Sequence, residues 1–297
     1  MSIIYKYQYL IDDENIHFDY LELNPQAIPL LQYLKRINWS RISQNSEAIH
    51  LIMKNIDRID WFNLSGNPSA IPLLEKYSSK INWYMLSSNS NAIHLLEHYL
   101  DKIDWDMLSG NPGAIHLLEQ YYERINWHIL SGNPSAIPLL KQYLHKIDWS
   151  MLSGNPNAIQ LLEANFHKID WRMLSGNPNA IPLLEKHIDK IDWWELAHNP
   201  NAIHLLEKHF NDIHVNWRGL SKNPNALHLL AKHSDEIDWI NLSRNPGLFE
   251  LDYLSMSKER TKRIEKELIS KALHPSKVSK WLEHYLATGG DIFDFEY

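Results

Sequence analysis

The chain has 297 residues, of which 44% are hydrophobic, and a formal net charge of −7. A chain of this length can bury a large core, and its acidic balance argues against a general polyanion-binding protein. It contains no cysteine, which excludes disulfide bonds and thiolate metal sites.

The first 23 residues are interpreted as a degenerate opening unit that caps the repeats after it. Within them, HFDY (His17 to Tyr20) stands roughly where later units place Asp or Asn followed by Trp. The segment lacks the basic start, apolar core and small-residue cleavage site of a signal peptide. Along the whole chain, no apolar run approaches the ~20 residues that a membrane-spanning helix needs. We therefore expect a protein that is neither secreted nor membrane-spanning.

A short unit repeats between residues 24 and 252. An asparagine, followed by Pro in nine units and by Ser in two, recurs mostly every 22 residues. It stands at Asn24, Asn45, Asn67, Asn89, Asn111, Asn133, Asn155, Asn177, Asn199, Asn223 and Asn245. Tryptophan follows the same spacing in a ladder of ten: Trp39, Trp61, Trp83, Trp105, Trp127, Trp149, Trp171, Trp193, Trp217 and Trp239. Repetition at a fixed short period indicates a stacked array of small units.

Each unit carries two helix-start signals. Asn is a preferred N-cap and Pro is favourable at the first helical position. Apolar residues follow at helical spacing, as at Ile93, Leu96 and Leu100, which predicts a helix of about three turns. Asp or Asn precedes each of the ten Trp residues, which predicts a second helix of about one and a half turns.

Proline inside the first helix leaves an alternative for its beginning. In four units a Pro stands five residues after the Asn, where its missing N–H would break a helical hydrogen bond. The Asn-Pro step is then a separate turn or 3₁₀ segment, and the regular helix begins near the following Ile.

The motif Leu-Ser-x-Asn at this period also resembles leucine-rich repeats, whose inner strand needs an apolar residue five places before the Asn. Those places hold residues as different as Phe62, Asp106 and Arg172. We therefore predict an all-α fold, a right-handed α-solenoid of about ten 22-residue two-helix repeats over residues 24–252. Layers of about 8–10 Å give a curved rod of roughly 80–100 Å, whose two ends need caps.

Residues 253–297 abandon the repeat. Lys258–Ala272 reads as a charged helix, His274–Leu286 as a further helix, and the tail DIFDFEY as acidic and aromatic. Residues such as Ile264 and Trp281 supply enough apolar surface to cover one exposed face. We predict that this segment is a helical cap that docks on the final repeat, while the tail stays free or reaches a partner.

The unit N-P-x-A-I-x-L-L-E…K-I-D-W-x-x-L-S resembles the short tandem repeats of proteins encoded by giant DNA viruses. The ending, NPGLFELDY followed by KALHPSKVSKWLEHYLATGGD, is similar to the C-terminal segments of the same family. The resemblance covers about Leu21 to Gly290, with Ser46 and Ser90 in place of Pro and a two-residue insertion before Trp217. It implies a viral protein of the host cytoplasm or the virion, and it implies no catalytic residues.

None of the residues that could carry chemistry forms an enzymatic pattern. Five histidines share the fifth place after the Asn: His50, His94, His116, His204 and His228. Equivalent places lie about one helix diameter apart, too far to share a metal ion with bonds of about 2 Å. The repeated Ser is interpreted as a turn former, and the repeated Gly as a helix-end residue that relieves backbone strain. We therefore predict no catalytic site, no metal and no cofactor.

Two repeated features have both a structural and a binding interpretation. The Trp ladder can pack between units or present stacking surfaces to a partner, and its fixed spacing from a Leu favours packing. A basic row stands two places before the Asp or Asn: Arg58, Lys80, Lys102, Arg124, Lys146, Lys168 and Lys190. These cations can complement a helix C-terminus or form a stripe for an acidic partner, and the first interpretation is favoured.

The variable positions are the candidate partner-binding ridge. The two residues after each Trp change from unit to unit while their neighbours stay fixed, and such positions carry specificity in a solenoid. The ridge comprises Phe62, Asn63, Tyr84, Met85, Asp106, Met107, His128, Ile129, Arg172, Trp194 and Glu195.

These features predict a non-enzymatic scaffold for protein–protein interaction, a monomer with a viral or host protein as its partner. One alternative is a structural virion component that braces or assembles the capsid. Another is a single-stranded RNA-binding helical repeat that reads one base per unit. Net acidity makes nucleic acid the least favoured partner.

Overall fold

The computed structural model describes residues 18–31, 37–211 and 214–249, together with nine helical residues between Ser255 and Ser279. The chain divides into two compact units: Tyr9–Phe249, which holds the repeats, and Met1–Gln8 with Glu250–Tyr297. Most of both predicted caps, residues 1–17 and 253–297, therefore lies outside the described residues. Of the apolar residues expected to cover the final repeat, only Ile264 is described, and it is exposed.

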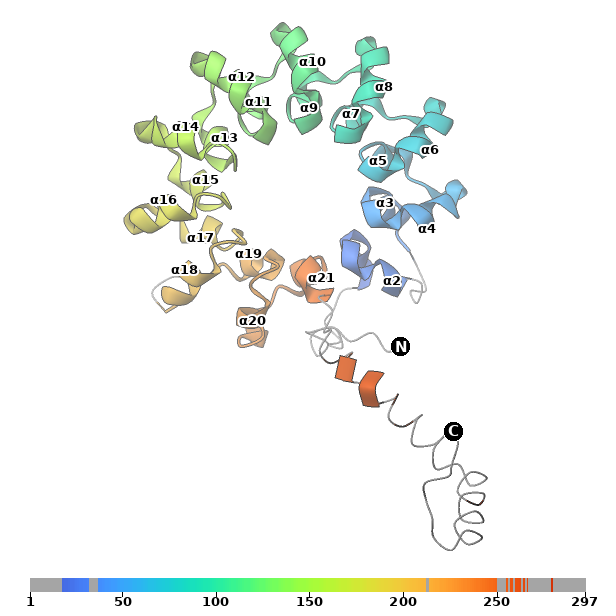
Figure 1. Cartoon of the computed structure of the whole chain (residues 1–297), viewed down its shortest axis with the longest axis vertical. Coiled ribbons are helices and arrows are strands. Elements are labelled where there is room, and N and C mark those ends of the chain that lie inside the picture. Colours follow the sequence, from blue (N-terminus) through green and yellow to red (C-terminus); the bar gives the residue numbers. More distant parts are fainter. Residues whose placement is uncertain are drawn as a thin grey trace, which may run out of the picture. The chain divides into compact units, whose positions relative to one another are not determined.

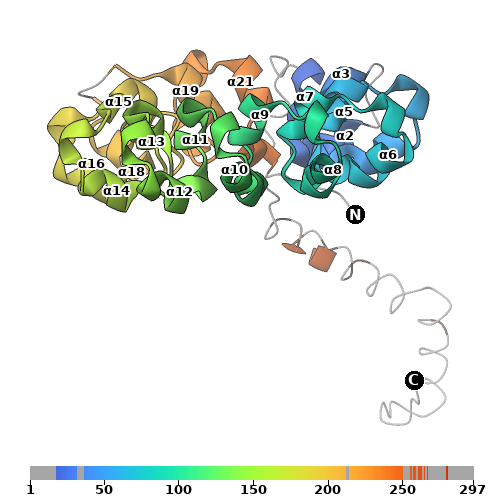
Figure 2. The same cartoon turned by 90° about the horizontal axis from the view of Figure 1, so that it is seen from above.

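The array of repeats consists of two rows of short helices (Figure 1). The inner row contains η1 (Phe18–Leu23), α3 (Trp39–Gln44), α5 (Trp61–Ser65), α7 (Trp83–Ser87), α9 (Trp105–Ser109), α11 (Trp127–Ser131), α13 (Trp149–Gly154), α15 (Trp171–Ser175), α17 (Trp193–Leu196), α19 (Trp217–Lys222) and α21 (Trp239–Ser243). The outer row contains α2 (Ile28–Leu31), α4 (Ile49–Met53), α6 (Ile71–Lys76), α8 (Ile93–His98), α10 (Ile115–Gln120), α12 (Ile137–Gln142), α14 (Ile159–Glu163), α16 (Ile181–Lys186), α18 (Ile203–Lys208) and α20 (Leu227–Leu230). Figure 2 shows the rows displaced from each other along the axis of the array. Every regular element in the described ranges is helical, which confirms the all-α solenoid.

Most outer helices are flanked by 3₁₀ turns. Those that precede them are η2 (Pro25–Ala27), η3 (Ser46–Ala48), η5 (Pro68–Ala70), η7 (Ser90–Ala92), η9 (Pro112–Ala114) and η11 (Pro134–Ala136), and η16 (Pro246–Phe249) follows α21. Those on the other side are η4 (Ile56–Arg58), η6 (Ser78–Lys80), η8 (Leu100–Lys102), η10 (Tyr122–Arg124), η12 (Leu144–Lys146), η13 (Phe166–Lys168), η14 (Ile188–Lys190) and η15 (Ser234–Glu236). We name each repeat by its Trp and let it run to the residue before the next Trp, with Phe18 in the Trp place of the first.

The helix starts follow the capping signals, but the longer helix is broken. Asp60 accepts a hydrogen bond from the backbone N–H of Asn63 and opens α5, as predicted for the Asp-Trp step. Asn67 caps a short 3₁₀ turn, and the α-helix begins only at Ile71. The alternative of a separate Asn-Pro turn is thus confirmed. The single helix of about three turns is wrong, because α6 also ends early at Tyr77, whose φ of −118° and ψ of 49° leave the helical region.

The core lies between the two rows and repeats with them. In the Trp61 repeat, Leu64 of the inner helix, Ala70 of the turn and Leu74 of the outer helix are fully buried. The same places are buried in the neighbouring repeats, for example Leu130, Ala136 and Leu140. Each repeat is too small to bury these side chains alone, so the array is stabilised by stacking.

The whole array of repeats within Tyr9–Phe249 closes on itself as a ring. The amide of Asn24 donates to the backbone carbonyl of Asn245 at 2.8 Å and lies 3.5 Å from that of Ser243. The amide of Asn67 makes the equivalent contacts with the carbonyls of Asn45 and Ser43 in the repeat that precedes it. Figure 1 shows α21 beside the first inner segment, and the guanidinium of Arg244 lies 4.4 Å from the ring of Tyr20.

Ring closure corrects the prediction of an open rod. The face of the last repeat, for which a cap was predicted, is occupied by the first repeat of the same unit. The geometric reason is a constant small rotation between repeats, which adds up to one full turn over the eleven copies of the Asn turn within residues 24–245.

Candidate binding surfaces

The two residues after each Trp, predicted together as a ridge, have different surroundings. The first is exposed on the inner-row helices: Phe62 and Tyr84 retain 48% of their accessible surface and Trp194 57%. Asp106, His128 and Arg172 occupy the same place and are also exposed. We call these six residues the inner ridge. They are the part of the predicted surface that is open to a partner.

The second residue packs between repeats. Asn63, Met85, Met107, Ile129 and Glu195 are all half-buried. A Cβ added to Gly66 would meet the Met85 side chain at 2.9 Å, and one added to Gly110 would meet Ile129 at 3.1 Å. Gly66 has an ordinary φ of −83°, so the relief of backbone strain predicted for these glycines is wrong. At Gly66 and Gly110, Gly is used because a side chain of the next repeat approaches closely.

Polar contacts join the middle of the inner ridge to the residues that cap the next inner helices. Nδ1 of His128 lies 2.8 Å from a carboxylate oxygen of Asp148, and Asp106 accepts a hydrogen bond from Asn126 at 2.9 Å. The pKa of Asp148 is lowered, chiefly because the backbone N–H of Met151 donates to its carboxylate, with burial opposing and His128 adding to the effect. The middle of the ridge is therefore polar, and its side chains pair with the caps of the next inner helices.

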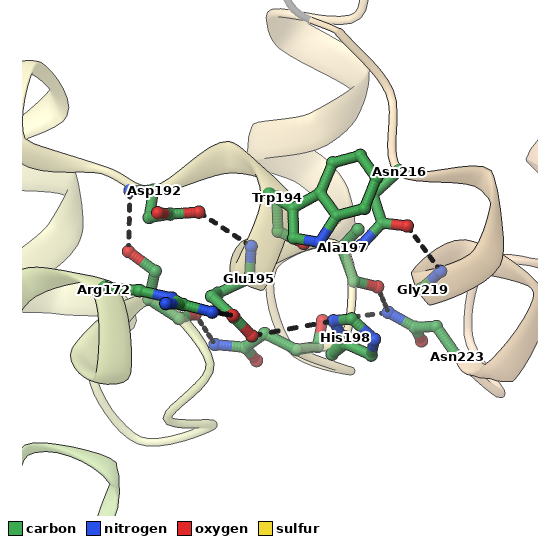
Figure 3. Close-up of polar contacts among 11 residues, drawn as sticks. Arg172, Asp192, Trp194, Glu195, Ala197, His198, Asn216, Gly219 and Asn223 are labelled. Atoms are coloured by element: carbon green, nitrogen blue, oxygen red, sulfur yellow. Dashed lines mark hydrogen bonds and ion pairs between the residues drawn. The ribbon is translucent and has the colours of Figure 1, made fainter.

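A second polar cluster lies where the ridge passes from α15 to α17 (Figure 3). The guanidinium of Arg172 donates twice to Glu195, at 3.1 and 2.8 Å, and the hydrogen bond raises the pKa of Arg172. Glu195 also lies 4.0 Å from His198. This exposed ion pair contributes little stability, but it fixes the side chains beside Trp194.

The Trp ladder forms one wall of each repeat. Trp127 of α11 lies 5.1 Å, between ring centroids, from Tyr143 at the end of the outer helix. The same pair recurs as Trp61–Tyr77, Trp83–Tyr99 and Trp105–Tyr121, and with His in place of Tyr as Trp171–His187, Trp193–His209 and Trp217–His233. The ten tryptophans, from Trp39 to Trp239, are half-buried. Each pair ties an inner helix to the outer segment of its own repeat.

Four residues of the basic row lie over this aromatic wall. Nζ of Lys102 is 4.8 Å from the ring centroid of Trp83, and that of Lys168 is 4.4 Å from Trp149. Arg58 and Lys190 stand over Trp39 and Trp171 in the same manner. The cations are exposed, so the side chains cover the indoles while the charges face solvent. This cation–π arrangement was not predicted from the sequence.

Two further ladders, also missed by the sequence reasoning, connect the repeats. The amide of each landmark Asn donates to backbone carbonyls of the preceding repeat, as Asn155 does to Ser131 and Asn133 at 3.0 and 2.9 Å. The hydroxyl of Ser131 accepts from the backbone N–H of Asp148, the residue that caps the inner helix of the next repeat, and donates to the carbonyl of Trp127. The Asn and the Ser recur in almost every repeat, but the sequence pattern was interpreted only in terms of helix caps and turns.

One junction lacks the serine and is bonded differently (Figure 3). Ala197 stands in the serine place of the Trp193 repeat and has no hydroxyl to accept from the next cap. The amide of Asn216 instead donates to the backbone carbonyl of Trp194 at 2.9 Å, while its oxygen still caps α19 at Gly219. This bond takes the place of the missing serine bond, and the amide of Asn223 still donates across the junction to the carbonyls of Ala197 and Asn199, at 3.1 and 3.0 Å.

Four of the five histidines at the fifth place after the Asn contact the preceding repeat. Nε2 of His116 lies 2.7 Å from Glu97, and His94, His204 and His228 contact a Glu in the same way. Among the described residues, no three His, Asp or Glu side chains gather closely enough to hold a metal ion. None of the helices in the described ranges combines the length and apolarity needed to cross a bilayer.

Comparison of the chain with protein-family models, with curated proteins and with solved structures gives no match.

Proposed function

We propose that this chain is a non-enzymatic repeat scaffold that binds a protein partner through the inner ridge. The observation that carries the proposal is the exposure of Phe62, Tyr84 and Trp194 on one repeated position of a scaffold whose other positions are fixed by packing. Large aromatic side chains are the residues that most often dominate the free energy of protein–protein association. The resemblance to giant-virus repeats supports a viral or host partner, in the host cytoplasm or the virion.

The ridge has the composition expected of an interface. Aromatic side chains at Phe62, Tyr84 and Trp194 stand on either side of a polar stretch that includes Asp106 and His128. Apolar anchors beside paired polar groups are typical of specific, non-obligate interfaces. A bracing role in the capsid that depends on rod length is less favoured, because a closed ring offers no two distant ends to bridge.

Site-specific photocrosslinking tests the proposal. A photoreactive phenylalanine analogue at position 62, 84 or 194 should capture one defined protein from infected cells. The same analogue at Met53 of α4 is the control, because Met53 is as exposed (56%) as Trp194 but lies in the outer row.

Substitution provides the second arm. A Phe62→Ala, Trp194→Ala double variant should lose capture of that protein while its thermal unfolding matches that of the parent, since both side chains are exposed. Met53→Ala should leave capture unchanged. Equal capture from position 53 and from the ridge, or full binding by the double variant, would refute the assignment.

A further inference from the structure

A second surface, independent of the inner ridge, combines apolar and cationic side chains. On five successive repeats, the 3₁₀ turn after the outer helix begins with an apolar residue and ends with a base. The pairs are Leu100 and Lys102, Tyr122 and Arg124, Leu144 and Lys146, Phe166 and Lys168, and Ile188 and Lys190. We call these ten residues the basic–apolar stripe.

The apolar half of the stripe is held in place and remains accessible. Tyr122 stacks on Tyr143 of the next repeat, with ring centroids 6.3 Å apart and planes at 11°. Phe166 contacts His187 of the next repeat at 5.0 Å. Despite these contacts, Tyr122 keeps 48%, Leu144 45% and Phe166 39% of their accessible surface. Exposed apolar side chains on four successive repeats, with Ile188 half-buried on the fifth, mark an interaction surface.

The five basic residues of the stripe can bind a negatively charged ligand. All five bases are exposed, and no ion pair among the described residues engages them. The residue between the apolar one and the base is acidic at Asp101, Glu123 and Asp189, but it is histidine at His145 and His167. The positive character is therefore strongest around Lys146 and Lys168, on a chain whose net charge is −7.

We propose that the stripe binds an extended protein segment in which carboxylates and apolar side chains each recur every third residue. Neighbouring repeats lie about 8–10 Å apart, and a polyproline II segment rises about 3.1 Å per residue with three residues per turn, so every third side chain lies on the same face and three ligand residues span one repeat. Each repeat then offers one apolar contact and one cation to each such triplet. The sequence DIFDFEY at 291–297 has this spacing, with Asp291 and Asp294 three apart and Ile292 and Phe295 three apart.

Single-stranded RNA fits the stripe less well. Base stacking needs an aromatic side chain at each step, but Leu100 and Leu144 alternate with Tyr122 and Phe166. An apolar peptide side chain packs equally well on Leu and on an aromatic ring.

The probe is a fluorescein-labelled DIFDFEY peptide, titrated with the full chain and followed by fluorescence anisotropy. We expect saturable binding that weakens with salt. An Arg124→Glu, Lys146→Glu variant should bind at least about tenfold more weakly, because two attractive charges become repulsive. Neither side chain lies over an indole in the structure, so the variant should unfold at the parent's temperature.

Two further variants separate charge from apolar contact. Tyr122→Ser with Phe166→Ser should weaken binding roughly fivefold through lost apolar burial. Lys186→Glu with Lys208→Glu makes the same charge change on the outer helices α16 and α18 and should alter binding less than about twofold. Absence of saturable binding, equal loss in the control, or tighter binding of a labelled ten-nucleotide oligouridine would overturn the proposal. Because none of these positions belongs to the inner ridge, failure here leaves the proposed function standing.

Discussion

The amide of each landmark asparagine is used at both ends. In the Trp149 repeat, the Oδ1 atom of Asn155 accepts from the backbone N–H of Asn157, while its Nδ2 donates to two carbonyls of the preceding repeat. Asp could perform the first role but not the second, because a carboxylate has no hydrogen to donate. The requirement for both roles explains why Asn is kept at all eleven positions within residues 24–245.

Asn155→Ala should lower the free energy of unfolding by about 2–3 kcal/mol, because it removes a cap and the side-chain donor to two buried carbonyls, of which that of Asn133 keeps the backbone N–H of Ala136. Asn157→Ala is a matched control. Asn157 donates to the carbonyl of Pro134 at a similar distance, 2.9 Å, but it is exposed, so its loss should cost less than about 1 kcal/mol. Urea unfolding followed by circular dichroism measures both. Equal losses would show that burial does not determine how much these asparagine hydrogen bonds contribute to the free energy of unfolding.

The sequence predicts only half of this residue's role. An Asn followed by Pro and an apolar periodicity is a local signal for a helix start, and the structure confirms it. The bond to the preceding repeat joins residues 22 and 24 positions apart, and no local pattern reveals which atoms meet. The exposure of Phe62, Tyr84 and Trp194 could be predicted, because variable positions in a repeat are seldom core. The packing of Met85 against the Gly66 turn could not.

At the scale of the element, each repeat is held together by its aromatic pair. Neither the inner nor the outer α-helix exceeds six residues in the described ranges, which is fewer than two turns, so neither would be stable alone. Trp127 and Tyr143 connect α11 to the end of α12, at a point where the backbone leaves the helical region. The sequence predicted both helices but joined the outer one to its flanking 3₁₀ turns, because apolar spacing alone does not show such breaks.

A double-mutant cycle on Trp127→Ala and Tyr143→Ala should give a coupling energy of about 0.5–1.5 kcal/mol for this edge-tilted aromatic pair. The natural control is the Trp149 repeat, where Asn165 takes the place of the Tyr. The same cycle on Trp149→Ala and Asn165→Ala should give a smaller coupling. Thermal unfolding of the four single and two double variants supplies the numbers, and equal coupling at both sites would contradict the pairing argument.

At the scale of the whole array, ring closure makes the first and last repeats neighbours. Asn24→Ala should therefore destabilise the unit about as much as Asn155→Ala, roughly 2–3 kcal/mol, because it removes the bond to Asn245. In an open rod the amide of Asn24 would face solvent and its loss would cost only the cap. Urea unfolding of the two variants side by side decides between ring and rod.

The sequence could not have predicted the ring. Periodicity shows that every junction is alike, and it therefore predicts a uniform curvature without giving its size. Closure depends on a rotation of about one eleventh of a turn per repeat, which arises from the packing of side chains such as Met85 and Ile129 against the preceding turn. A small change in that rotation would leave an open superhelix with the same local contacts.

A closed array also limits how its gene can change. Tandem repeats gain and lose copies by recombination, and an open solenoid tolerates such events because an added unit only lengthens it. In the ring, a twelfth copy would require every junction to rotate less, or would leave the contact of Tyr20 with Arg244 unmade. Selection for an intact seam would then fix the copy number, while leaving the exposed position after each Trp free to diversify.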